Sequence, residues 1–104
     1  MHARHLILAA TLALAACGGG RVTGDVSKAC MSGGRQAANA SLCSCVQQAA
    51  NQTLTAAEQR RAATFFADPQ RAQDTRQSGN SSDRAFWTRY RAFSSLAETM
   101  CRPA

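Results

Sequence analysis

Residues Asp83–Cys101 read DRAFWTRYRAFSSLAETMC, and this stretch decides the fold. Its apolar side chains recur every three or four residues, so they share one face of an α-helix; they are Phe86, Tyr90, Phe93, Ala97 and Met100. The opposite face is polar or charged and consists of Arg84, Thr88, Arg91, Ser95, Glu98 and Arg102. We expect the apolar face to form the core by packing on an earlier helix through Phe65 and Phe66. The alternative is a groove for a hydrophobic ligand.

Two helices are predicted before residue 54 by their caps and their apolar spacing. Asp25 or Ser27 caps the first, which runs through Met31 and is ended by Gly33-Gly34. Ser41 caps the second. The apolar residues of the second helix share one face; they are Leu42, Cys45, Val46, Ala49 and Ala50.

Two more helices are predicted between residues 55 and 77. Thr55-Ala56-Ala57-Glu58 has the pattern of a capping box and opens a helix that runs to Phe66. Asp68-Pro69 ends that helix, because the residue before a proline avoids the helical conformation, and starts the next with Asp68 as its cap. That helix runs to about Gln77 and is ended by Ser78-Gly79-Asn80. No stretch alternates apolar and polar residues for long, so the predicted fold class is all-α, a small bundle of four to five short helices.

The N-terminal 16 residues have the layout of a bacterial export signal. Met1–His5 is basic, Leu6–Leu14 is an apolar run, and Ala15-Ala16 are small. The apolar run is shorter than the roughly 20 residues that a membrane span needs. We therefore expect residues 1–16 to be removed as a signal peptide.

The four residues Leu14-Ala15-Ala16-Cys17 resemble the lipobox of bacterial lipoproteins. The resemblance implies that the Cys17 thiol receives a diacylglycerol, that the chain is cleaved before Cys17, and that the new amino group takes a further acyl chain such as palmitate. It also implies outer-membrane rather than inner-membrane sorting, because Gly18 rather than an aspartate follows the cysteine. The alternatives are an ordinary cleaved signal or a short buried helix, with Cys17 as a spare thiol.

The remaining 88 residues divide into a flexible glycine-rich tether at 17–24 and a helical domain at 25–104. They contain no histidine, because His2 and His5 both lie in the signal peptide. A Ser-His-Asp or Cys-His catalytic site and a zinc site with imidazole ligands are therefore excluded. The sequence predicts no cofactor, no metal site and no catalytic residues.

Four cysteines remain once lipid has taken Cys17, and in an oxidising compartment they are expected to form two disulfides. Residues two apart on a helix point in nearly opposite directions, so Cys43 and Cys45 should have different partners. We favour Cys45 with Cys101 and Cys30 with Cys43, while Cys43 with Cys101 is the close alternative. A redox or metal-transfer role for Cys43-Ser44-Cys45 is a second interpretation, although no thioredoxin-like pattern surrounds it.

The mature chain carries eleven basic and six acidic residues, and ten of the basic residues are arginine. Arginine binds carboxylate and phosphate groups through a planar fork, so this bias suits an anionic partner. The candidate anion-binding residues are Arg60, Arg61, Arg84, Arg89, Arg91 and Arg102, and Arg71 and Arg76 can also face solvent. The alternative is a solvated surface in which Glu58 pairs with Arg61 and Glu98 with Arg102.

Stretches along residues 20 to 102 resemble small lipoproteins of marine-type alphaproteobacteria that sometimes carry the label "arginine transporter"; among them are residues 47–54, 58–63, 65–69 and 86–90. The resemblance assigns no catalytic or binding residue. Physical arguments oppose the label, because 88 residues hold no membrane span and a net positive chain repels a cationic amino acid.

The sequence therefore predicts a periplasm-facing, lipid-anchored protein that acts as a non-catalytic binding or assembly factor of the cell envelope. Its partners are expected to be the membrane, through the lipid, and an anionic envelope component or acidic protein. Nucleic acid is not expected, since an exported protein rarely meets it. The alternatives are an accessory solute-binding component of a transporter, or a thiol oxidoreductase that uses Cys43 and Cys45.

Overall fold

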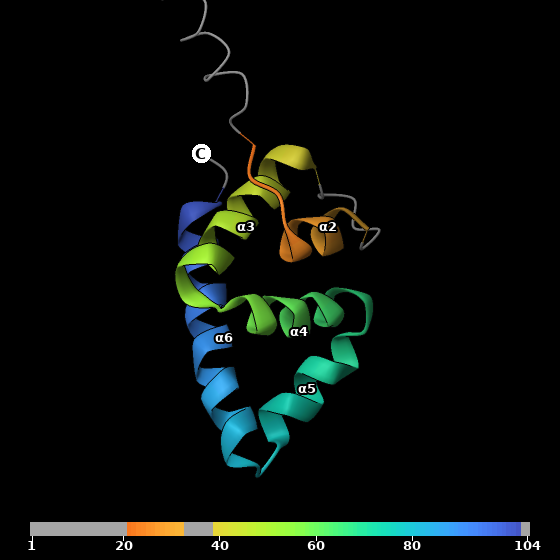
Figure 1. The fold of residues 1–104 in the computed structure, drawn as a ribbon, viewed down its shortest axis with the longest axis vertical. Helices are drawn as coiled ribbons and strands as arrows, with labels where there is room; N and C mark the ends of the chain where they lie inside the picture. The colour runs from red at the N-terminus through yellow and green to blue at the C-terminus, as the bar shows by residue number, and fades with distance from the viewer. Residues whose placement is uncertain (1–20, 33–38, 103–104) are drawn as a thin grey trace, which may run out of the picture.

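The computed structural model describes residues 21–32 and 39–102, and within these ranges it contains five α-helices and no strand. The helices are α2 (Asp25–Ser32), α3 (Ala40–Thr53), α4 (Ala56–Ala67), α5 (Pro69–Gln77) and α6 (Ser81–Met100). In Figure 1, α2 and α3 form one end of the molecule, α4 crosses the middle, and α5 and α6 converge at the other end. The all-α fold class is confirmed. The predicted signal peptide, Cys17 and Gly33-Gly34 lie outside the described residues.

The starts of α3, α4 and α6 follow local side-chain capping, with two shifts from the prediction. Asp25 and Ser27, predicted to cap α2, lie inside that helix instead. Asn39 rather than Ser41 caps α3, because its Oδ1 accepts the Leu42 N–H at 2.8 Å. Asn80 caps α6 by accepting the N–H groups of Ser82 and Asp83, so α6 starts at Ser81, two residues earlier than predicted. In both places an asparagine, which is among the strongest N-caps, lies just upstream of the predicted residue.

The start and the end of α4 follow the sequence prediction, except that Asp68 does not cap the next helix, α5. The capping box is confirmed: Thr55 Oγ1 accepts the Glu58 N–H at 3.2 Å, and Glu58 Oε1 accepts the Thr55 N–H at 2.9 Å. Pro69 occupies the first turn of α5, but the Asp68 side chain makes no capping hydrogen bond. Its carboxylate instead lies 3.4 Å from Arg71, with which it pairs.

The apolar face of α6 packs on Phe65 of α4, as predicted, within a core that α2 and α3 also line through Val26, Ala49 and Ala50. Phe86 and Phe93 on α6 are each 3% exposed, and Phe65 on α4 is 5% exposed. The Phe65 ring packs edge-on against Phe86 and Tyr90, with ring centroids 6.0 and 5.1 Å apart, a favourable geometry for aromatic pairs. Met100, at the end of this face, is 36% exposed and does not belong to the core.

A buried amide joins α2, α3 and α4. Gln47 on α3 is 1% exposed. Its Oε1 accepts the Ser27 N–H of α2 at 2.8 Å, and its Nε2 donates to Asn51 at 2.9 Å and to Gln59 of α4 at 2.7 Å. Gly24, just before α2, has no side chain to cap that helix, so the Gln47 carbonyl satisfies a first-turn N–H in its place.

Two disulfides cross-link the bundle in the pairing that helix geometry favoured. Cys30 of α2 is bonded to Cys43 of α3 with Cα atoms 5.6 Å apart, and Cys45 of α3 is bonded to Cys101 with Cα atoms 5.7 Å apart. The first disulfide is buried, whereas both cysteines of the second are partly exposed. Cys43 and Cys45 therefore have different partners.

The folded part of the chain begins before the predicted domain boundary at Asp25. The Val22 N–H donates to Ser44 Oγ of α3 at 2.8 Å. Gly24 lies so close to Gln47 that a Cβ atom there would be 2.8 Å from the Gln47 amide carbon. Val22 and Gly24, expected in the tether, thus contact α3.

Candidate functional sites

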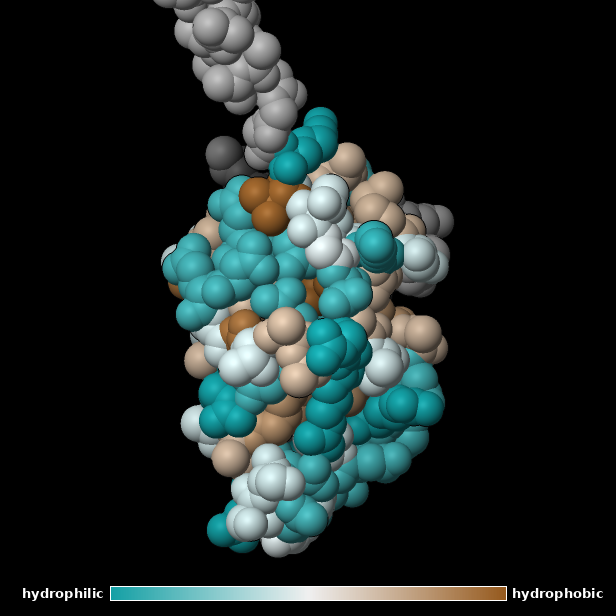
Figure 2. Space-filling model, in the orientation of Figure 1, coloured by the Kyte–Doolittle hydropathy of each residue, from teal (hydrophilic) through white to brown (hydrophobic). Residues whose placement is uncertain are grey.

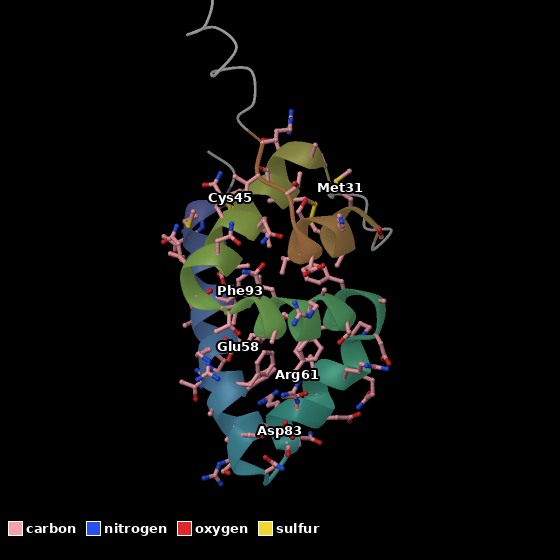
Figure 3. All side chains as sticks on the ribbon, in the orientation of Figure 1. Met31, Cys45, Glu58, Arg61, Asp83 and Phe93 are labelled. Atoms are coloured by element: carbon pink, nitrogen blue, oxygen red, sulfur yellow. A yellow bond between two sulfur atoms is a disulfide. The ribbon has the colours of Figure 1, made fainter. Side chains whose placement is uncertain are left out.

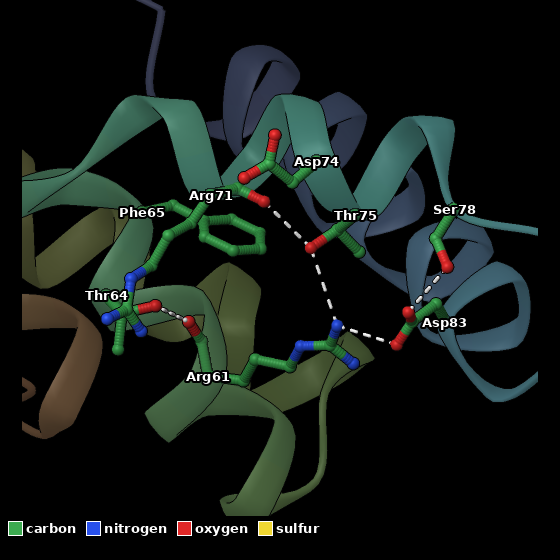
Figure 4. Close-up of a pocket in the computed structure, with 8 residues that line it drawn as sticks. All are labelled: Arg61, Thr64, Phe65, Arg71, Asp74, Thr75, Ser78 and Asp83. Atoms are coloured by element: carbon green, nitrogen blue, oxygen red, sulfur yellow. Dashed lines mark hydrogen bonds and ion pairs between the residues drawn. The ribbon is translucent and has the colours of Figure 1, made fainter. Parts of the chain in front are cut away.

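A polar cavity of about 350 Å³ lies between α4, α5 and the start of α6 (Figure 4). It is lined by Arg61, Thr64, Phe65, Arg71, Asp74, Thr75, Ser78 and Asp83. The turn that Asn80 caps brings Ser78 and Asp83 to the side chain of Arg61. The cavity combines two cations, two anions and three hydroxyl groups, so it is the first place to look for a ligand site.

Arg61 is the central side chain of this cavity, and its guanidinium is held on three sides. It donates to Asp83 Oδ1 at 2.8 Å and to Thr75 Oγ1 at 3.4 Å. It also lies 4.5 Å from the centroid of the Phe86 ring, within the range of a cation–π contact. Arg61 therefore links α4, α5 and α6 rather than standing free for an anion.

The remaining charges of the cavity are also paired within the chain. The Ser78 hydroxyl donates to Asp83 Oδ2 at 2.7 Å, and this bond, followed by that from Arg61, lowers the pKa of Asp83 below its ordinary value. Arg71 pairs with Asp68, and Asp74 accepts a hydrogen bond from Gln70 at 3.0 Å. A ligand would have to displace these contacts, so the cavity is best described as an internal ion-pair network.

A second ion pair joins α6 to the start of α4. Arg89 bonds Glu58, and the hydrogen bond from Arg89 is the largest of the causes that lower the pKa of this carboxyl. The predicted pairing of Glu58 with Arg61 is therefore wrong. The reason is local, because Glu58 turns back toward Thr55 to complete the capping box, while Arg61 reaches Asp83 from the next turn.

The ion pairs divide the six candidate anion-binding arginines into two groups. Arg61 and Arg89 have acidic partners. The other four, within the described residues, have no acidic partner and are exposed; they are Arg60, Arg84, Arg91 and Arg102. The predicted pair of Glu98 with Arg102 is not formed among these residues, although both side chains border one shallow hollow.

The unpaired arginines of α6 form a stripe and not a cluster. Arg84 and Arg91 are two helical turns apart, about 10 Å along the outer face of α6, and Arg102 lies just beyond the end of that helix. We call Arg84 and Arg91 the α6 stripe. Arg60 lies on α4 and Arg102 borders the hollows beside Cys101, so neither belongs to the stripe. The helix thus places two of the four unpaired candidates on one line.

Cys43 and Cys45, the candidate redox pair, are each bonded to another cysteine in a disulfide. Two hollows border Cys45, with volumes of about 400 and 430 Å³. Among the described residues, no group of three metal-ligating side chains occurs, and no helix is long and apolar enough to cross a bilayer.

Sequence reasoning missed the two residues that organise the interior polar contacts, Gln47 and Asp83. Gln47 lies one helical turn from both Cys43 and Asn51, so its position on the inner face of α3 was readable from the helical period. Its partners were not, because they come from three helices. Asp83 was read only as the start of a helix, although its carboxylate accepts bonds from Ser78 and Arg61.

The chain has no match among protein-family models, curated proteins or solved structures.

Proposed function

We propose that this protein is a lipoprotein held through acylated Cys17 on the periplasmic face of an envelope membrane, the outer rather than the inner one. In this proposal its helical domain is a non-catalytic binding or assembly factor that meets an anionic partner through the α6 stripe. The lipobox-like Leu14–Cys17 supports the acylation. The disulfides support an oxidising compartment, where such bonds persist.

The observation that carries the binding role is the contrast between paired and unpaired arginines. Three arginines are used internally, against Asp83, Glu58 and Asp68. Those of the α6 stripe are exposed and have no acidic partner in the described part of the chain, so their charge is available to carboxylate or phosphate groups. A surface that carries only positive charge also accelerates the encounter with an anionic partner.

Intact mass of the membrane-extracted protein tests the acylation. We expect loss of residues 1–16 and a gain from acyl chains on Cys17, because two or three chains give stable anchoring where one gives only marginal binding. The Cys17→Ala variant should leave the membrane fraction. Unchanged membrane partitioning of that variant would contradict the proposal.

Binding to a polyglutamate peptide and to an acidic polysaccharide, measured across salt concentration, tests the α6 stripe. Arg84→Gln with Arg91→Gln should weaken binding and reduce its salt dependence, since exposed charges are screened within about 8 Å at physiological ionic strength. The matched control is Lys28→Gln with Arg76→Gln, which removes the same charge from two other exposed positions. Equal weakening by both variants would mean that net charge, and not the stripe, binds the anion.

The two other interpretations have tests of their own. A thiol oxidoreductase that uses Cys43 and Cys45 predicts a free or readily reduced thiol pair, which thiol counting on the native protein measures. An accessory solute-binding component predicts saturable binding of a small solute in the cavity around Arg61, which calorimetry measures.

A further inference from the structure

One surface carries apolar side chains that the core does not use. Leu42 is half-buried but lies outside the core cluster formed by the described residues, and Met100 is 36% exposed. Both line the hollow of about 430 Å³ beside the partly exposed disulfide Cys45–Cys101. The second hollow, of about 400 Å³, also borders Cys45. We call this surface the tether face; its residues are Arg21, Leu42, Cys45, Met100, Cys101 and Arg102.

The tether face is positively charged as well as apolar. Arg21 lines one hollow and Arg102 the other, and both are exposed and without an acidic partner in the described ranges. Glu98 lines an adjoining hollow that shares Leu42, Cys101 and Arg102 with the tether face, and it forms no ion pair with Arg102 among the described residues. Figure 2 shows hydrophobic and hydrophilic surface side by side at the end where the described chain begins. Apolar side chains rimmed by arginine are the composition of surfaces that rest in a headgroup layer.

Covalent geometry keeps this face near the acylated residue. Arg21 follows Cys17 by four residues, and an extended chain spans at most about 3.6 Å per residue, so their Cα atoms are at most about 14 Å apart. The headgroup layer is itself about 5 to 8 Å thick, and charge attraction extends over about 8 Å at physiological salt. A diacylated Cys17 would thus hold Arg21 within reach of the lipid phosphates.

We infer that the tether face rests on the headgroups of an anionic phospholipid bilayer, with Leu42 and Met100 against the lipid and the two arginines at the phosphates. This inference rests on the proposed acylation of Cys17. It adds an orientation: in Figure 1, the α5–α6 turn lies at the opposite end from the described N-terminus. The cavity around Arg61 and the start of the α6 stripe would then face away from the membrane. Figure 3 shows the same separation, with Cys45 near one end and Asp83 near the other.

The experiment uses the full acylated protein in vesicles of phosphatidylcholine, with and without phosphatidylglycerol, whose acyl chains are brominated to quench tryptophan. Leu42→Trp in a Trp87→Phe background reports on the tether face, since Leu42 lies outside the core cluster. The native Trp87 is the control, about 21 Å along α6 from Cys101. Circular dichroism checks that the variants keep their helices.

We expect strong quenching of the Leu42→Trp probe on anionic vesicles, weaker quenching on neutral ones, and little quenching of Trp87 on either. Arg21→Gln and Arg102→Gln should each lower, about fivefold, the ratio of protein whose tether face contacts lipid to protein whose tether face does not. The matched control, Arg71→Gln with Arg76→Gln, removes two exposed charges from α5, outside both the tether face and the α6 stripe, and should leave the ratio unchanged.

Four results would overturn the inference, and they are distinguishable. Equal quenching of both tryptophans, or none at position 42 in protein that floats with the vesicles, would mean that the face does not lie on lipid while the acylation stands. Protection of the Leu42→Trp probe from an aqueous quencher without quenching by brominated lipid would assign the face to a second protein copy. Protein that fails to float would refute the acylation, and the orientation with it.

Discussion

Replacing Gln47 by leucine should destabilise the domain although leucine is apolar and of similar size. The side chain is 1% exposed, and its Oε1 is the acceptor for the Ser27 N–H, a buried donor in the first turn of α2. A buried donor left without a partner costs about 1 to 3 kcal/mol, and the loss of a helix cap costs a similar amount. Asn51 and Gln59 keep a hydrogen bond to each other and have access to water, so they add little.

We therefore expect Gln47→Leu to lower the free energy of unfolding by about 1 to 3 kcal/mol. In a domain of this size the melting temperature should fall by roughly 4 to 8 °C for each kcal/mol. Urea unfolding of the oxidised protein, followed by far-UV circular dichroism, measures the change. The control is Gln48→Leu, the same substitution at the exposed neighbouring position. Variants that differ by less than about 0.5 kcal/mol would refute the role of the buried amide, because this is the usual scatter of surface substitutions.

The same site has a second test through Gly24. An alanine Cβ there would lie 2.8 Å from both Cδ and Oε1 of Gln47, which is too close for non-bonded atoms. Gln47 cannot move aside without losing its hydrogen bonds, so Gly24→Ala should cost about 1 to 3 kcal/mol. In a Gln47→Ala background the space is free and most of this cost should disappear, and a double-mutant cycle measures that coupling. Additive costs would contradict the contact.

Three further perturbations have directions that the structure fixes. Replacing Cys45 and Cys101 by serine opens a loop of 56 residues and should lower the free energy of unfolding by about 4 kcal/mol. Removal of the Cys30–Cys43 disulfide, which spans 13 residues, should cost about 1 kcal/mol less. Equal costs would contradict the loop-entropy reasoning. The pKa of Glu58 in the folded protein lies below its ordinary value of 4.5. The contribution of this carboxylate to folding stability is therefore complete above about pH 4.5 and is lost as the pH falls through the lower folded value. The urea midpoint should drop on acidification, and it should drop less in Glu58→Gln. Phe65→Ala should cost about 3 to 5 kcal/mol by thermal or urea unfolding, whereas Met31→Ala, at a position 49% exposed, should cost little.

The parts of the fold that sequence predicted are those fixed by neighbours along the chain. The capping box at Thr55 and the end of α4 before Pro69 involve residues within four positions of each other, so their patterns are visible in the sequence. The starts of α3 and α6 were displaced because two cap-forming residues lay close together, such as Asn39 and Ser41, and propensity alone does not choose between them.

The candidate site was less predictable because its contacts join distant residues. Arg61 and Asp83 are 22 positions apart, and Glu58 and Arg89 are 31 apart. Helical spacing predicts only partners one turn away, so it predicted an ion pair between Arg61 and Glu58. The disulfides were an intermediate case, since the opposite directions of Cys43 and Cys45 on one helix reduced the choice of partners without locating them.

The cross-links are distributed unevenly, and this bears on where a partner would be met. Both disulfides and the buried Gln47 involve α3, and together they tie it to α2, α4 and the end of α6. In contrast, α5 carries no disulfide and buries only Thr75 among its residues. It is held to α4 by the Arg61–Thr75 hydrogen bond and to the start of α6 by the Ser78–Asp83 hydrogen bond, both of which are only partly buried. Segments with few buried contacts open at the lowest free energy. If the tether face rests on lipid, the rigid end lies at the membrane and the compliant end projects into the periplasm, where rearrangement around a partner costs least.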